Sequence, residues 1–259
     1  MSHQTPLSTQ QDAPDADLAA AIENLYNVFK RYPLKSPTEG CPCCVTADEV
    51  AQLESKPLRQ LLPTDLDHFA KSALTTWGSV ADFKHFLPRI LECIAFNADV
   101  PFDIEIAIGK LAYGQWQDWP QAERLAVRQY LKSWWRYQLS NPVVDGLYRS
   151  QIDTILCAIG RAEVDVADYL NIWRNAPLAA GSLQLADLIH HNQACLLKRR
   201  ELNNAFWEDP QMEQVIIWLC EPETGQQLET AFYQAVDEAA KASLSLAVQE
   251  WEWLKVRCG

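Results

Sequence analysis

The stretch SVADFKHFLPRILECI, residues 79–94, decides the fold of this chain more directly than any other. Its apolar residues recur at spacings of three and four, at Phe83, Phe86, Leu87, Ile90, Leu91 and Ile94. This period places one continuous apolar stripe along an α-helix, and Ser79 stands where a residue caps the amino terminus. Pro88 lies inside the pattern and predicts a kink, because it removes one amide donor and frees the carbonyl of Lys84.

The same helical spacing extends in both directions from this stretch, between the prolines and glycines that end each segment. Residues 100–108 are ambiguous, because their apolar side chains alternate as they do in a strand. A strand needs a partner, and the sequence offers none, so we predict a helix over about 103–116. The other predicted helices cover residues 18–32, a short segment from 46, then 64–76, 120–139, 146–160, 165–175, 183–203, 210–220 and, with a break, 221–257.

From residue 64 to residue 219 these helices fall into successive pairs. Two helices in about 40 residues are typical of HEAT-like repeats, but no residue pattern recurs from pair to pair. An irregular multi-helix bundle is therefore the alternative. The sequence predicts an all-α fold of stacked helical hairpins, HEAT-like or irregular, in a single domain over residues 15–259, preceded by a disordered polar segment over residues 1–14.

Composition narrows the class of protein. The 259 residues are 48% hydrophobic and 22% charged, and the formal net charge is −12. This acidity argues against nucleic-acid binding, which needs a basic surface. No apolar run approaches the roughly 20 residues that span a bilayer, and the N-terminal residues do not have the pattern of a signal peptide. We therefore expect a cytoplasmic protein that binds neither nucleic acid nor membrane.

The segment GCPCC, residues 40–44, gathers three cysteines within four positions. Thiolates prefer soft or borderline metal ions, and a closed zinc site needs four ligands. Cys41, Cys43 and Cys44 are therefore candidate metal ligands, with zinc as the ion. The fourth donor must come from elsewhere in the chain, and the candidates are His85 and His68.

Two other interpretations of the cysteine segment stay open. Cys41 and Cys44 have two residues between them and are a candidate redox pair. A helix begins directly downstream at Thr46, where the capping-box pattern with Glu49 is present, and its dipole favours a thiolate at Cys44. A tight turn that simply packs three small sulfurs is the third interpretation. The remaining cysteines include Cys93, Cys157, Cys195 and Cys220, which lie singly among apolar residues and predict free thiols.

No catalytic motif is visible in the chain, so whether it is an enzyme is left open. Its ten tryptophans include the pairs Trp134 with Trp135 and Trp251 with Trp253. At least one ring of each pair must face a neighbouring helix or an exposed groove, because both cannot point to one side of a helix. An acidic, aromatic-rich helical surface predicts an interaction protein with a basic protein partner, of the immunity or antitoxin type.

Three segments carry a resemblance: GCPCC at 40–44, TTWG at 75–78 and DFKHFLPR at 82–89. Together they resemble an uncharacterised bacterial protein family over about the first half of the chain. The resemblance implies a bacterial source and brings no activity, ligand or fold with it.

Overall fold

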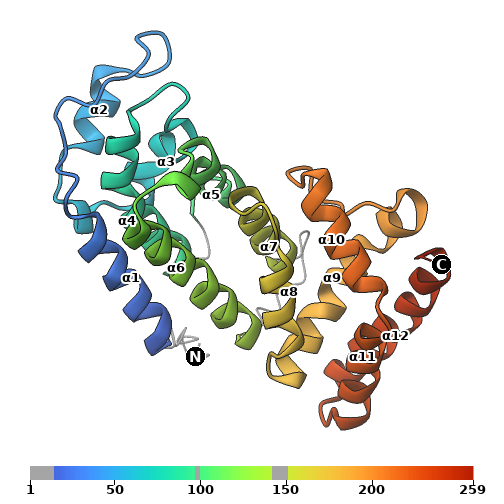
Figure 1. Ribbon diagram of the computed structural model, residues 1–259. Helices are drawn as coiled ribbons and strands as arrows, with labels where there is room; N and C mark the ends of the chain where they lie inside the picture. The colour runs from blue at the N-terminus through green and yellow to red at the C-terminus, as the bar shows by residue number, and fades with distance from the viewer. Residues whose placement is uncertain (1–14, 97–99, 142–150, 259) are drawn as a thin grey trace, which may run out of the picture.

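The computed structural model describes residues 15–96, 100–141 and 151–258, and within these ranges the chain is helical without a strand (Figure 1). The predicted all-α fold is therefore confirmed. Two isolated bridges, Gly40 with Trp77 and Ala73 with Trp77, are the only strand-like pairings of the described residues. The predicted disordered segment 1–14 lies outside the described residues, as do the first residues of the helix predicted over 146–160.

Within the described ranges, twelve α-helices and two short 3-10 helices follow one another along the chain. They are α1 (Ala16–Phe29), α2 (Ala47–Leu53), η1 (Leu58–Gln60), α3 (Pro63–Ser72), α4 (Val80–Phe96), α5 (Ile104–Tyr113), η2 (Trp116–Asp118), α6 (Gln121–Ser140), α7 (Gln151–Ala162), α8 (Ala167–Arg174), α9 (Leu178–Arg199), α10 (Asp209–Cys220), α11 (Pro222–Gln234) and α12 (Glu238–Cys258).

Local chemistry accounts for where several helices begin. The Thr46 side chain accepts a hydrogen bond from the Glu49 amide, and the Glu49 carboxylate accepts one from the Thr46 amide, so the predicted capping box starts α2. Ser79 and Asp82 make the same reciprocal pair at the start of α4. The ambiguous segment after Val100 forms α5, as predicted from the absence of a partner strand.

The apolar stripe of α4, from Phe83 to Ile94, is buried in full. Every one of its six residues on α4 is at most 6% exposed, and α4 runs as one helix from Val80 to Phe96 with Pro88 inside it. Burying six large apolar side chains contributes roughly 1.5–3 kcal/mol each. This stripe is therefore the part of the core that a sequence pattern placed correctly.

The helices pack most closely with partners that are not their neighbours in sequence. Helix α5 lies against α7, α1 lies against α6, and α9 lies against α12. Of the four successive pairs expected from the sequence, α3 and α4 are in contact, and the other three make slight contact at most among the described residues. The architecture is accordingly the irregular multi-helix bundle. Helices α1–α6 lie on one side of the molecule, α7 and α8 lie in the middle, and α9–α12 lie on the other side (Figure 1).

A buried ion pair joins α4 to α6. Lys84 Nζ lies 2.7 Å from Glu123 Oε2, and the two side chains are 8% and 0% exposed. The other carboxylate oxygen of Glu123 accepts a 2.7 Å hydrogen bond from the Tyr32 hydroxyl. The ammonium of Lys84 also lies 4.2 Å from the centre of the Trp119 ring. Each charge thus has several partners, which is the condition under which a buried pair is tolerated.

Removing one partner of this pair should be costly. We expect Lys84→Met to lower the free energy of unfolding by about 3–5 kcal/mol, because Glu123 is then buried without its counter-charge. The double variant with Glu123→Leu should recover much of this loss. Urea denaturation measures both, with Lys71→Ala as the control, since Lys71 belongs to an exposed pair with Asp67 that is worth less than about 1 kcal/mol. Equal effects of Lys84→Met and Lys71→Ala would contradict the argument.

Candidate functional site

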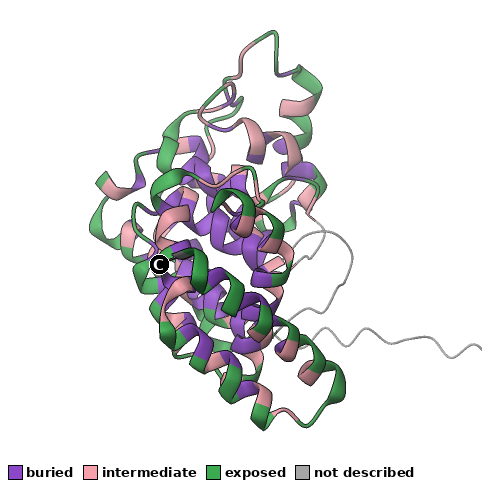
Figure 2. Ribbon diagram, turned by 90° about the vertical axis from the view of Figure 1, so that its right-hand side faces the viewer, coloured by how far each residue is buried: buried purple, intermediate pink, exposed green. Residues whose placement is uncertain are grey.

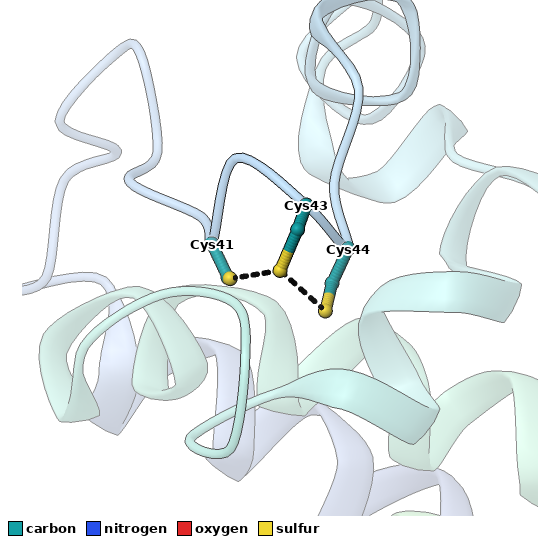
Figure 3. Close-up of side chains that lie close together, drawn as sticks. All are labelled: Cys41, Cys43 and Cys44. Carbon is teal, nitrogen blue, oxygen red and sulfur yellow. Dashed lines mark hydrogen bonds between the residues drawn. The ribbon is translucent and has the colours of Figure 1, made fainter.

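The three cysteines lie on a tight turn between α1 and α2. The carbonyl of Cys41 accepts hydrogen bonds from the amides of Cys44 and Val45, both at 2.9 Å. These two bonds fold the chain back on itself within five residues. As a result Cys41, Cys43 and Cys44 direct their sulfur atoms to the same side of the turn (Figure 3).

A distant segment holds this turn in place. The Cys41 amide donates to the carbonyl of Thr76 at 2.8 Å, and the Gly78 amide donates to the carbonyl of Glu39 at 2.7 Å. These bonds flank the bridge between Gly40 and Trp77. The cysteine turn is therefore fixed by backbone contacts with the loop that joins α3 to α4, and not by its own sequence alone.

Gly40 is required by a close approach within the turn. A Cβ atom built at this position would lie 2.8 Å from Cβ of Val45 and 3.0 Å from both of its γ-carbons. Val45 is itself buried, so it has little room to move away. Any larger residue at position 40 would push apart the two ends of the turn that bring the sulfurs together.

The sulfur atoms form a compact group. Sγ of Cys41 lies 2.9 Å from Sγ of Cys43, which lies 3.5 Å from Sγ of Cys44, and all three lie within 4.8 Å of one another. A tetrahedral zinc ion with bonds of about 2.3 Å holds its sulfurs roughly 3.8 Å apart. An opening of less than about 1 Å would therefore let the three sulfurs share one ion. Cys43 and Cys44 are exposed and Cys41 is half-buried, so the group is accessible from solvent.

The thiols differ in acidity because they bond to one another. The pKa of Cys41 is lowered, chiefly because its thiolate accepts a hydrogen bond from the Cys43 thiol. The pKa of Cys43 is raised to about 11, chiefly because its proton is held by Cys41. Of this pair, Cys41 is thus the thiol that ionises first. The sequence favoured a thiolate at Cys44 through the α2 dipole, and it could not show the bond between Cys41 and Cys43.

The predicted histidine donors do not join this group. Among the described residues, only the three cysteines form a group of three or more potential metal-ligand atoms that all lie within 4.8 Å of one another. His85 lies on α4, and its Nδ1 is 2.8 Å from the carbonyl oxygen of Tyr32. His68 lies on α3, and its Nδ1 is 2.8 Å from a carboxylate oxygen of Glu49. The structure therefore brings together three of the four predicted ligands and leaves the identity of a fourth open.

The other cysteines divide into two kinds. Cys93 and Cys157 are buried and Cys195 is half-buried, and none of the three forms a disulfide, as the sequence predicted. Cys220 at the end of α10 is disulfide-bonded, so the prediction of a free thiol there was wrong. Apolar neighbours in the sequence predict that a cysteine is buried. Whether it forms a disulfide depends on which helix ends the fold brings together.

A buried acidic cluster was missed in the sequence. Asp153 on α7 and Glu105 on α5 are 5% and 1% exposed. Trp207 Nε1 donates to Asp153 at 2.8 Å, and Asn204 Nδ2 donates to Glu105 at 2.8 Å. Burial, with a smaller contribution from the charge of Glu105, raises the pKa of Asp153 to about 6, against the lowering effect of the Trp207 bond. In the sequence, the feature that could have indicated this buried acid is a carboxylate that follows Ile152 in an apolar run.

The tryptophan pairs are placed as their spacing requires. Trp134 and Trp135 are both buried and face different neighbours within the bundle, with Trp135 Nε1 donating to the carbonyl of Tyr169. Trp251 is 4% exposed, whereas Trp253 is 54% exposed on the same helix. The last pair thus supplies the predicted exposed aromatic residue.

Comparisons of the chain with protein-family models, with curated proteins and with solved structures found no match. Among the described helices, none combines the length and the hydropathy that crossing a bilayer requires. The candidate site is therefore interpreted from its own geometry.

The hydrogen bond from Cys43 should set the acidity of Cys41. We expect Cys43→Ala to move the pKa of Cys41 part of the way back towards its ordinary value, because the strongest donor to the thiolate is lost while the backbone amides and the Cys44 thiol remain. Cys43→Ser keeps a hydroxyl donor and should keep most of the lowering. The pH dependence of iodoacetamide modification at Cys41, followed by peptide mass spectrometry, measures this. Identical profiles for the two variants would contradict the assignment.

Asp153 should make stability depend on pH. Its pKa is about 6 in the folded protein against 3.8 for an ordinary aspartate, so the folded state holds this proton more tightly. The corresponding stability is present below pH 3.8 and is lost as the pH rises to about 6. This loss amounts to about 3 kcal/mol, since one pKa unit corresponds to about 1.4 kcal/mol. Relative to Asp153→Asn, wild-type unfolding free energy should fall across this range, as measured by urea denaturation at each pH.

Proposed function

We propose that the protein binds a thiophilic metal ion through Cys41, Cys43 and Cys44, with zinc as the ion. The single observation that supports this proposal is the convergence of three sulfurs within 4.8 Å on one accessible face of a turn. Such a group offers three anionic ligands of the type that zinc and copper(I) prefer.

The donor set fits an open site better than a closed one. Structural zinc sites use four protein ligands, whereas three protein ligands leave one position for water or an incoming group. Neither His85 nor His68 lies within the sulfur group. Because Cys43 and Cys44 are exposed, the fourth position would face solvent, and the ion would be exchangeable.

The split acidity of Cys41 and Cys43 supports thiol–disulfide exchange as a second candidate function. In that reaction the Cys41 thiolate attacks a disulfide substrate, forms a mixed disulfide and releases one thiolate. The Cys43 thiol then loses its proton, attacks Cys41 and releases the second thiolate of the substrate. The protein is oxidised to a Cys41–Cys43 disulfide while the substrate disulfide is reduced to two thiols. The cysteine pair differs from the Cys41–Cys44 pair expected from the sequence.

Zinc binding is tested by titrating zinc into reduced protein purified without a metal-affinity tag, with calorimetric detection. We expect one ion per chain for the wild type. Serine substitution of Cys41, Cys43 or Cys44 should each weaken binding at least roughly tenfold, because each removes a ligand. Cys195→Ser is the matched control, since Cys195 is a half-buried free thiol outside the cluster.

The outcomes of this titration separate the two functions. Failure to bind zinc, or equal affinity in all four variants, would end the metal proposal. Oxidation with a small disulfide and peptide mapping then tests exchange. A Cys41–Cys43 disulfide that forms and is reduced reversibly supports it, and resistance of both thiols to oxidation opposes it. The predicted basic protein partner concerns the surface as a whole and stays a prediction.

A further inference from the structure

Helix α12 carries apolar residues on two opposite faces. Its inner face is formed by buried residues that pack on α9, α10 and α11, namely Leu244, Ala247, Trp251 and Leu254. Trp251 fixes this face, because its ring lies where a Cβ on Gly225 would stand, at 2.4 Å, and its Nε1 donates to the carbonyl of Leu219 at 2.8 Å. The inner face packs on these helices without using the apolar residues of the outer face.

The outer face of α12 is exposed along its whole length. Its residues recur at alternating spacings of three and four, at Ala239, Ala242, Leu246, Gln249, Trp253 and Val256, which we call the outer seam. This spacing is that of a helix seam that packs against another helix. Leu246, Trp253 and Val256 are 41%, 54% and 79% exposed, which is unusual for large apolar side chains in line. Helix α12 lies at the edge of the molecule opposite α1 (Figure 1), and buried and exposed residues alternate along the helices on that side (Figure 2).

The two ends of the outer seam differ in size. Its first positions are the small residues Ala239 and Ala242, and its last are the large residues Trp253 and Val256. Beside the small end, α9 and α12 enclose a groove of about 500 Å³, lined by Leu183 and Ala186 of α9 together with residues of the seam. One end of the helix therefore offers a hollow, and the other offers a protruding ring.

The two ends also differ in charge. Asp187 and Asp237 line the groove, and Glu238 follows directly at the start of α12. The last turn of α12 carries Lys255 and Arg257, and Lys255 is paired with Glu252 at 3.5 Å. The small end of the seam is therefore acidic, and the large end offers the basic side chain of Arg257.

We propose that the outer seam binds a second copy of this chain, with the two α12 helices antiparallel about a two-fold axis. Antiparallel packing sets Ala239 against Val256 of the other copy and Ala242 against Trp253 of the other copy. Each Trp253 ring then enters the groove of the opposite copy, and each basic end meets an acidic one. A two-fold interface is self-complementary in this way, since every contact is made twice.

A second copy fits these observations better than another occupant does. The α12 residues of the groove and the Trp253 ring lie on the same helix, at about equal distances from its middle. A second copy in the reversed direction can therefore place a ring in both grooves at once. Two chains of charge −12 repel each other overall, and the pairing of Arg257 with the acidic groove opposes this repulsion where the copies meet.

The experiment is analytical ultracentrifugation of the full chain over a range of concentrations. We expect the wild type to pass from 29.4 kDa to twice that mass. Trp253→Ala should raise the dimer dissociation constant at least roughly tenfold, because it removes the aromatic ring that enters the groove of the other copy. Ala242→Trp should do the same from the other side, because its own side chain fills the groove. Arg257→Glu should weaken the dimer and reduce its sensitivity to salt.

Two controls keep the result interpretable. Tyr233→Ala removes an aromatic residue that is 82% exposed and lies outside the seam, so it should leave the dimer intact. At a protein concentration at which the wild type is monomeric, thermal unfolding followed by circular dichroism should be unchanged in every variant, since each replaces an exposed residue. A wild type that stays monomeric at every concentration, or a dimer that Trp253→Ala leaves unaffected, overturns the proposal.

Discussion

The buried pair of Lys84 and Glu123 is the interaction on which the arrangement of the N-terminal helices depends. It joins α4 to α6, and it reaches the chain beyond α1 through the hydroxyl of Tyr32. The backbone carbonyl of the same tyrosine is bonded to His85, again from α4. Tyr32, from which the chain turns towards the cysteine segment, is therefore held by α6 through its hydroxyl and by α4 through its carbonyl. A pair this deeply buried also constrains register, because neither charge tolerates displacement from its partner.

Fixing the chain at Tyr32 matters for the cysteine turn, because residues 30–39 between α1 and the turn form no helix or strand. The turn gains its shape from local bonds to the Cys41 carbonyl and its position from the segment between α3 and α4. Helix α4 therefore influences the position of the cysteine turn in two ways. It bonds the chain before the turn at Tyr32, and it begins directly after the loop whose backbone bonds the turn. Because its backbone is held in this way, the turn keeps the three accessible thiols close together. Three cysteines on a mobile segment would separate, since gathering them would cost conformational entropy.

Sequence reasoning succeeded where the physics is local. The period of the α4 stripe, the capping box at Thr46 and the lack of a partner strand after Val100 each involve residues within a few positions of one another. It failed where contact between distant segments decides the outcome. Consecutive helices suggested hairpins, yet α5 packs on α7 and α9 on α12, because interhelical packing depends on complementary surfaces and not on chain order. The prediction that Cys220 is a free thiol failed for a similar reason, because the sequence around a cysteine does not show which distant segment the fold places beside it.

The sequence by itself determined that the chain is helical, where most helices lie and that three thiols stand within four residues. These properties follow from periodicity, capping and covalent proximity. Only the tertiary structure decided that the three sulfurs point the same way, that His85 is engaged with Tyr32, and that Asp153 is buried beside Glu105. It also decided which apolar face of α12 is covered. Each of these depends on what distant helices place around a side chain, and burial, hydrogen bonding and pKa are properties of those surroundings and not of the residue.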